Sequence, residues 1–152
     1  MSLSRVLLVE DSPEDILFFR KACAQAGWTW PLEVVKDGQE AVDSLSARQG
    51  SDTCPSHLIL DLKLPGVSGL QILEWIRAHP VLATLPVIIL TSSQVPSDIH
   101  QASALGVDAF LVKPVSFKAL VDVVHEIAAR WKIPVAPVQE IAAPTERGRG
   151  SE

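Results

Sequence analysis

The run His57-Leu58-Ile59-Leu60-Asp61 joins a short apolar segment to a single carboxylate. It is followed by Leu62-Lys63-Leu64-Pro65-Gly66, whose proline and glycine are typical of a turn. A short, uninterrupted apolar run is typical of a strand that is covered on both faces. We therefore expect Asp61 at the end of a buried strand, where rigid backbone holds its carboxylate toward solvent.

Polar side chains follow three other apolar runs in the same way. They are Glu10 and Asp11 after residues 6–9, Thr91 after residues 87–90, and Lys113 after residues 110–112. In open α/β sheets, ligands bind outside the carboxyl ends of the parallel strands. We therefore expect three acids, one hydroxyl and one ammonium group to share a single pocket.

Along the rest of the chain, short apolar runs alternate with longer segments in which apolar residues recur with a helical period. Segments with a helical period follow the short apolar runs, which predicts an α/β fold with a parallel sheet and helices on both faces. The expected strands are residues 5–9, 32–35, 57–60, 86–91 and 109–112, and the expected helices are 13–27, 38–48, 68–79, 96–105 and 116–131. Ser12 and Pro13 mark the start of the first helix, and Gly27 marks its end.

Length and composition narrow the class of protein. The 152 residues suit one domain, and 47% of them are hydrophobic, which is enough for a single core. The formal net charge of −5 argues against a general nucleic-acid binder. No apolar run reaches the length of a membrane span, and the two cysteines lack metal-ligand spacing. We expect a cytoplasmic protein with reduced thiols and no secretory leader.

The segment after the last expected helix differs in composition. We expect the domain to cover residues 1–132, with a tail rich in proline, alanine and glycine over residues 133–152. Part of this tail is expected to be disordered, because it has no hydrophobic period. Residues 133–141 are more apolar than a solvated linker needs, and together with Trp131 they predict a homodimer.

The expected pocket favours phosphoryl chemistry. Two carboxylates at ~4 Å repel each other by roughly 4 kcal/mol at an effective dielectric constant of about 20. We therefore expect a bound cation to offset the repulsion among Glu10, Asp11 and Asp61. Oxygen ligands suit a hard divalent ion, and we expect Mg²⁺. Thr91 and Lys113 can contact phosphate oxygens, and a carboxylate can attack phosphorus to give an acyl phosphate. The set predicts Asp61 as a phosphoryl acceptor.

Five segments that contain these residues resemble the response-regulator receiver domain. In chain order they read VLLVEDSPED (6–15), VKDGQEAVDSL (35–45), LILDLKLPGVSG (58–69), PVIILTS (86–92) and GVDAFLVKP (106–114). The resemblance covers about residues 4–131. It implies a flavodoxin-like, doubly wound sheet of five parallel strands in the order 2-1-3-4-5.

The resemblance also implies a role for each site residue. Asp61 is the phosphoacceptor, and Glu10, Asp11, Asp61 and the backbone carbonyl of Lys63 bind Mg²⁺. Thr91 and Lys113 contact the phosphoryl group, and a cis peptide bond precedes Pro114. Phe110 takes the place of the aromatic switch residue, without the hydroxyl that a tyrosine would supply there.

Further features of the chain resemble those of the single-domain regulators that are paired with bacterial phytochrome histidine kinases. These features are the Glu-Asp-Ser-Pro-Glu-Asp opening of residues 10–15, the long stretch between Ser46 and Ser56, and the tail. The implied partners are a sensor histidine kinase, a second copy of the chain and a downstream protein. The implied output is a protein contact rather than enzymatic turnover.

Three other functions stay open at this point. A degenerate receiver would bind its partner constitutively. An aspartyl-nucleophile phosphohydrolase of the haloacid-dehalogenase type needs a second Asp two residues after the nucleophile, where this chain has Lys63. A flavodoxin-like nucleotide binder needs a phosphate-binding loop after the first strand, where this chain has Glu10 and Asp11.

Overall fold

The computed structural model describes residues 4–136 and contains one five-stranded parallel sheet. The strand order is β2-β1-β3-β4-β5, which confirms the predicted topology. The strands are β1 (Val6–Val9), β2 (Leu32–Val35), β3 (His57–Leu60), β4 (Val87–Thr91) and β5 (Ala109–Val112). The helices are α1 (Pro13–Ala26), α2 (Gly38–Arg48), α3 (Gly69–Ala78), α4 (Pro96–Ala104) and α5 (Phe117–Trp131).

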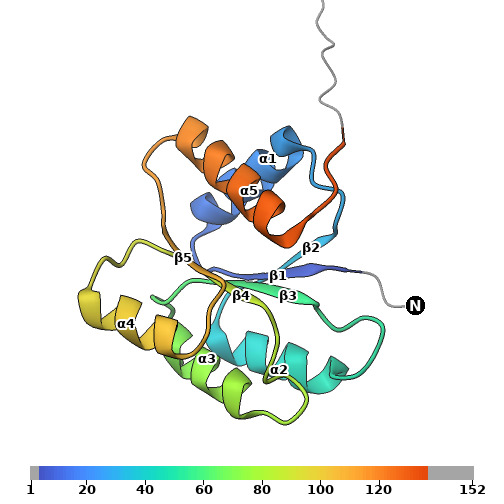
Figure 1. Cartoon of the computed structure of the whole chain (residues 1–152), viewed down its shortest axis with the longest axis vertical. Coiled ribbons are helices and arrows are strands. Elements are labelled where there is room, and N and C mark those ends of the chain that lie inside the picture. The colour runs from blue at the N-terminus through green and yellow to red at the C-terminus, as the bar shows by residue number, and fades with distance from the viewer. Residues whose placement is uncertain (1–3, 137–152) are drawn as a thin grey trace, which may run out of the picture.

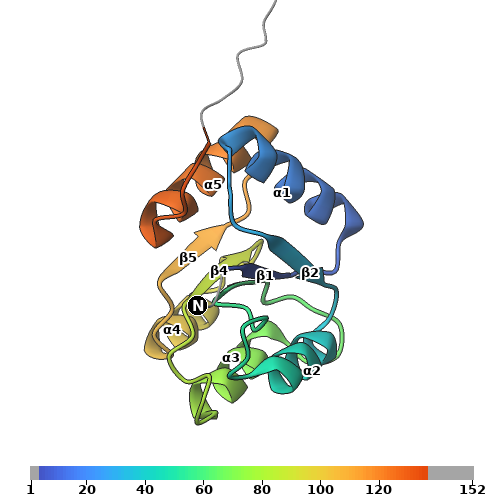
Figure 2. The same ribbon diagram turned by 90° about the vertical axis from the view of Figure 1, so that its right-hand side faces the viewer.

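The helices form a layer on each side of the sheet. Helices α1 and α5 cover one face, and α2, α3 and α4 cover the other, as Figure 1 shows with the sheet seen from its edge. The view in Figure 2, turned by 90°, shows the same three layers. The predicted coverage of both faces is therefore confirmed.

The alternation of side chains along each strand supplies both cores. Val6 and Leu8 of β1 pack into the core beneath α1 and α5, whereas Leu7 and Val9 pack into the core beneath α2 and α3. Successive side chains of a strand point to opposite faces, so a strand covered on both sides has to be apolar throughout. This requirement explains the uninterrupted apolar runs of the central strands.

The first helix begins and ends at the residues that the sequence indicates. The Ser12 hydroxyl accepts a hydrogen bond from the Asp15 amide, and Pro13 occupies the first turn. Gly27 ends α1 in the left-handed conformation, with φ of 80°. A side chain there would also meet the backbone of Ala136, which lies against this glycine.

The described part of the tail folds back onto the connection between α1 and β2. Trp28 and Val135 form an antiparallel bridge, and the Ala136 amide donates to the Gly27 carbonyl at 2.7 Å. Ile133 and Trp131 are buried in the core under α1 and α5. These apolar residues are therefore covered within the chain itself. Residues 137–141, the remainder of the expected interface segment, lie outside the described residues, as do 142–152.

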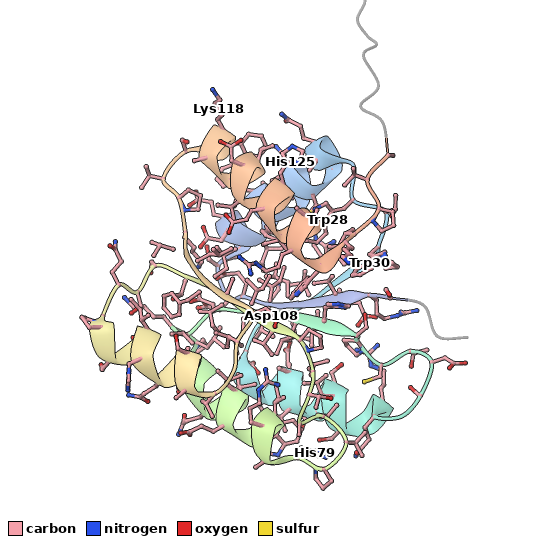
Figure 3. The ribbon with its side chains drawn as sticks, viewed as in Figure 1. Trp28, Trp30, His79, Asp108, Lys118 and His125 are labelled. Carbon is pink, nitrogen blue, oxygen red and sulfur yellow. The ribbon has the colours of Figure 1, made fainter. Side chains whose placement is uncertain are left out.

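An aromatic cluster lies at the amino ends of the strands, away from the expected pocket. The His57 ring packs between those of Trp30 and Trp131, at centroid distances of 4.9 and 4.7 Å. Trp131 donates its indole hydrogen to the Asp108 carboxylate at 2.8 Å. Figure 3 shows Trp28 and Trp30 beside α5 and Asp108 at the level of the sheet. The half-buried His57 ring therefore connects the start of β3 to the end of α5.

Within residues 4–136, no helix has the length and apolar character that crossing a membrane requires.

Candidate functional site

The strand order places the predicted polar residues at one edge of the sheet. β1 and β3 are neighbours in register, with Val9 opposite Leu60, so Glu10 and Asp61 follow adjacent strand ends. β4 and β5 are likewise paired, and the Lys113 amide donates to the Thr91 carbonyl at 2.8 Å. The four strands therefore bring the expected pocket together from segments far apart in the sequence.

Three carboxylates form a compact cluster in this pocket. Glu10, Asp11 and Asp61 each offer an oxygen, and these oxygens lie within 4.8 Å of one another. Glu10 and Asp61 are buried, whereas Asp11 is exposed. An all-oxygen set that is open on one side fits a hard divalent cation such as Mg²⁺, which retains several of its waters. These three residues would hold the ion.

Lys113 lies among the acids and forms three ion pairs. Its Nζ is 2.6 Å from Glu10 Oε1, 2.9 Å from Asp61 Oδ2 and 2.8 Å from Asp15 Oδ2. The sequence did not predict the Asp15 contact, because no local pattern pairs this first-turn residue of α1 with Lys113. The pocket thus contains four carboxylates and one ammonium group, and its net charge is negative.

Burial and ion pairing shift the pKa values of two of these groups. Burial raises the pKa of Glu10 above its usual value, although Lys113 and the Ser12 amide partly offset this effect. Burial alone would lower the pKa of Lys113, but its hydrogen bonds to Asp15, Glu10 and Asp61 outweigh burial and raise it. Lys113 is therefore a fixed positive charge across the physiological pH range.

The backbone around Asp61 fixes the position of its carboxylate. The Asp61 amide donates to the Val9 carbonyl at 3.2 Å, which extends the pairing of β1 and β3 by one bond. The Lys63 amide donates to Asp61 Oδ1 at 3.1 Å. Gly69, the first residue of α3, packs directly on the backbone of Asp61 and Leu62, where a Cβ atom would overlap the Asp61 carbonyl. The end of β3 and the start of α3 are therefore in close contact.

The remaining predicted residues lie around this center. Thr91 is fully buried at the end of β4, and its hydroxyl accepts a hydrogen bond from the Ser93 amide. The Ser93 hydroxyl in turn donates to Asp98 of α4 at 2.6 Å, which ties the loop after β4 to that helix. Phe110 is half-buried on β5 and packs against the core beneath α3 and α4.

The expectation of a cis bond before Pro114 is wrong, because the described residues contain no cis peptide bond.

The sequence was also compared with known families and proteins. Residues 6–125 match the family described as the response regulator receiver domain. The chain belongs to this family. The receiver domain thus accounts for both the strand order and the acidic pocket.

Two curated relatives have a similar length to this receiver. It is 35% identical over 127 residues to the probable methanogenesis regulatory protein FilR2 of Methanothrix harundinacea, covering 83% of this chain and 82% of FilR2. It is 31% identical over 129 residues to the response regulator Rcp1 of Synechocystis sp., covering 83% of this chain and 87% of Rcp1.

Solved structures extend the likeness to phytochrome regulators. The Mn²⁺-bound form of response regulator Rcp1 superposes with a TM-score of 0.76 at 28% identity, covering 93% of this receiver and 99% of Rcp1. The bacteriophytochrome response regulator RtBRR superposes with a TM-score of 0.71 at 37% identity, covering 91% of this receiver and 83% of RtBRR.

Proposed function

We propose that this chain is a single-domain response regulator that accepts a phosphoryl group on Asp61. The observation that carries the proposal is the position of the Asp61 carboxylate. It is buried at the end of a central strand, next to two further acids, and it is paired with Lys113. In this proposal residues 1–132 are the receiver and residues 133–152 are an additional tail.

The proposed reaction transfers a phosphoryl group from a phosphohistidine. An oxygen of the Asp61 carboxylate attacks phosphorus and forms a P–O bond, while the P–N bond breaks and the imidazole leaves with the electron pair. Lys113 and Thr91 bind the phosphoryl oxygens, and the Lys113 ammonium group supplies positive charge where negative charge develops during transfer. Water later attacks the phosphorus, releases phosphate and restores the carboxylate. Apart from this slow hydrolysis and transfer from small phosphodonors, the protein has no enzymatic turnover.

The acidic cluster supports a divalent cation as the cofactor. Glu10, Asp11, Asp61 and the Lys63 carbonyl are the proposed ligands, and the Mn²⁺-bound form of Rcp1 supports a divalent ion in this family. Bound Mg²⁺ would neutralise the carboxylates and the incoming phosphoryl oxygens.

The proposed partner is a sensor histidine kinase of the bacterial phytochrome class. This assignment is supported by the likeness to RtBRR, whose description names it as a bacteriophytochrome response regulator. The proposed output is an altered protein contact, in which Phe110 changes its burial as Thr91 moves toward the phosphoryl group. The absence of a hydroxyl on Phe110 limits that change to packing.

Intact mass after incubation with acetyl phosphate and Mg²⁺ tests the proposal. We expect one phosphoryl adduct on the wild type and none on Asp61→Asn, with both proteins folded by circular dichroism. An adduct on both would place the acceptor elsewhere. A wild type that neither forms an adduct nor binds beryllofluoride with Mg²⁺ would favour a degenerate receiver that binds its partner constitutively.

A homodimer is proposed on a different basis from the tail. Val95, which precedes α4, Ile99 of α4 and Val112 of β5 are exposed apolar residues on neighbouring elements. Exposed apolar surface of this kind favours association. Sedimentation at tens of micromolar, with and without acetyl phosphate, tests it. Monomer alone under both conditions would overturn the dimer but not the phosphoacceptor proposal.

A further inference from the structure

Lys113 forms an ion pair with Asp15, a residue that is neither a proposed metal ligand nor the proposed phosphoryl acceptor. An ammonium group has three hydrogens to donate, and Lys113 Nζ has three carboxylate partners within 2.9 Å. Two of these partners, Glu10 and Asp61, belong to the acidic cluster. The third, Asp15, is outside that cluster and comes from the first turn of α1. No donor of Lys113 is therefore free for a further anion.

The three partners differ in how readily they can leave Lys113. The side chains of Glu10 and Asp61 are 5% exposed, whereas that of Asp15 is 42% exposed. A carboxylate that can turn into water loses little when it leaves an ammonium group, but a buried carboxylate without a partner is costly. Asp15 is thus the partner that can be exchanged at the lowest cost.

We propose that Asp15 is a positioning residue that occupies the third donor of Lys113 until a phosphoryl group on Asp61 displaces it. This inference rests on the proposed function of Asp61. Before phosphorylation Asp15 holds Lys113 against the pocket and links α1 to the segment that follows β5. When the phosphoryl oxygens arrive, Asp15 opposes them in two ways, since it competes for the same ammonium hydrogen and it places a like charge beside them. Asp15 therefore lowers the affinity of the pocket for the phosphoryl group.

Beryllofluoride titration at saturating Mg²⁺ tests this inference, because beryllofluoride is a noncovalent stand-in for the phosphoryl group. The affinity is read from the shift in melting temperature across the titration. We expect Asp15→Asn to bind about three- to tenfold more tightly than the wild type, the range for removing one partly exposed charge beside a bound anion. Asp15→Glu keeps the charge and the acceptor atoms, so we expect its affinity to stay within about twofold of the wild type.

Glu14→Gln is the matched control. Glu14 is an exposed acid in the same first turn of α1, and its substitution removes the same charge. We expect this variant to bind beryllofluoride as the wild type does. If Glu14→Gln increased the affinity for beryllofluoride as much as Asp15→Asn does, the increase would come from net charge alone. That result would overturn the specific role of Asp15.

The failure of this inference is distinguishable from the failure of the proposed function. Asp15→Asn that binds as the wild type does, or more weakly, would show that Asp15 does not compete for Lys113, while Asp61 remains the acceptor. A wild type that binds no beryllofluoride with Mg²⁺ would overturn both.

Discussion

At the scale of single residues, the cluster of Glu10, Asp11 and Asp61 is a local cost that a bound cation removes. An ion that binds only the folded chain stabilises it by RT ln(1 + L/Kd), where L is the free ion concentration. We expect millimolar Mg²⁺ to raise the melting temperature by about 2–4 °C in scanning calorimetry, the shift for roughly 1 kcal/mol of stabilisation in a chain of this size. Asp11→Asn should melt higher than the wild type without Mg²⁺ and gain less when it is added. An equal gain in this variant would exclude Asp11 from the metal site.

His57 makes a second contribution at this scale, through pH. Burial lowers its pKa below the usual 6.5, and the nearby charge of Asp108 offsets only part of this effect. The unfolded chain then binds more protons than the folded chain below about pH 6.5, so stability falls as pH falls through the folded pKa. We expect the urea midpoint to drop between pH 7.5 and 5.5, and His57→Phe to lose most of that drop. If the urea midpoint of His57→Phe dropped as much as that of the wild type, the pH dependence would come from other groups.

At the scale of elements, the contact between α3 and the end of β3 links stability to the pocket. Gly69, the first residue of α3, has no room for a Cβ atom against the backbone of Asp61, whereas Gly66, in the loop before this helix, is surrounded by open space. We expect Gly69→Ala to cost about 1–3 kcal/mol in urea unfolding, as overpacking does, and to slow phosphorylation of Asp61. Gly66→Ala should cost only the strain of its φ of 72°, about 1–2 kcal/mol, with phosphorylation unchanged. Equal phosphorylation rates in the two variants would contradict this link.

At the scale of the whole molecule, the two cores share one sheet, so they should unfold together. Ile133 closes the core beneath α1 and α5 from the far end of the described chain. We expect Ile133→Ala to cost about 2–4 kcal/mol, and Val135→Ala, at a half-exposed position, to cost under about 0.5 kcal/mol. Circular dichroism and calorimetry should give the same midpoint for each protein. Two separate transitions would mean that the two cores, one on each face of the sheet, unfold independently.

Neighbouring residues encode the strands and helices of this chain, but they do not encode every contact between distant segments. Local patterns predicted every strand and helix to within two residues, because β-branched runs, caps and turns are encoded in neighbouring residues. The strand ends also predicted which polar side chains would meet. The contacts of Asp15 with Lys113, and of His57 with Trp131, join positions 98 and 74 residues apart. No periodic pattern in the sequence relates residues that are so far apart, so only the folded structure reveals these contacts.

The placement of the tryptophans has an optical consequence. The protein contains no tyrosine, so its ultraviolet emission comes almost entirely from four tryptophans. Three of them, Trp28, Trp30 and Trp131, gather beneath α1 and α5 at the end of the sheet opposite Asp61, and the His57 ring touches two of them. The emission of these three therefore reports how α5 and the following segment are seated, whereas Trp75 lies in α3 on the other face of the sheet. A change in the emission of these three on phosphorylation would be a signal that has crossed the full length of the strands.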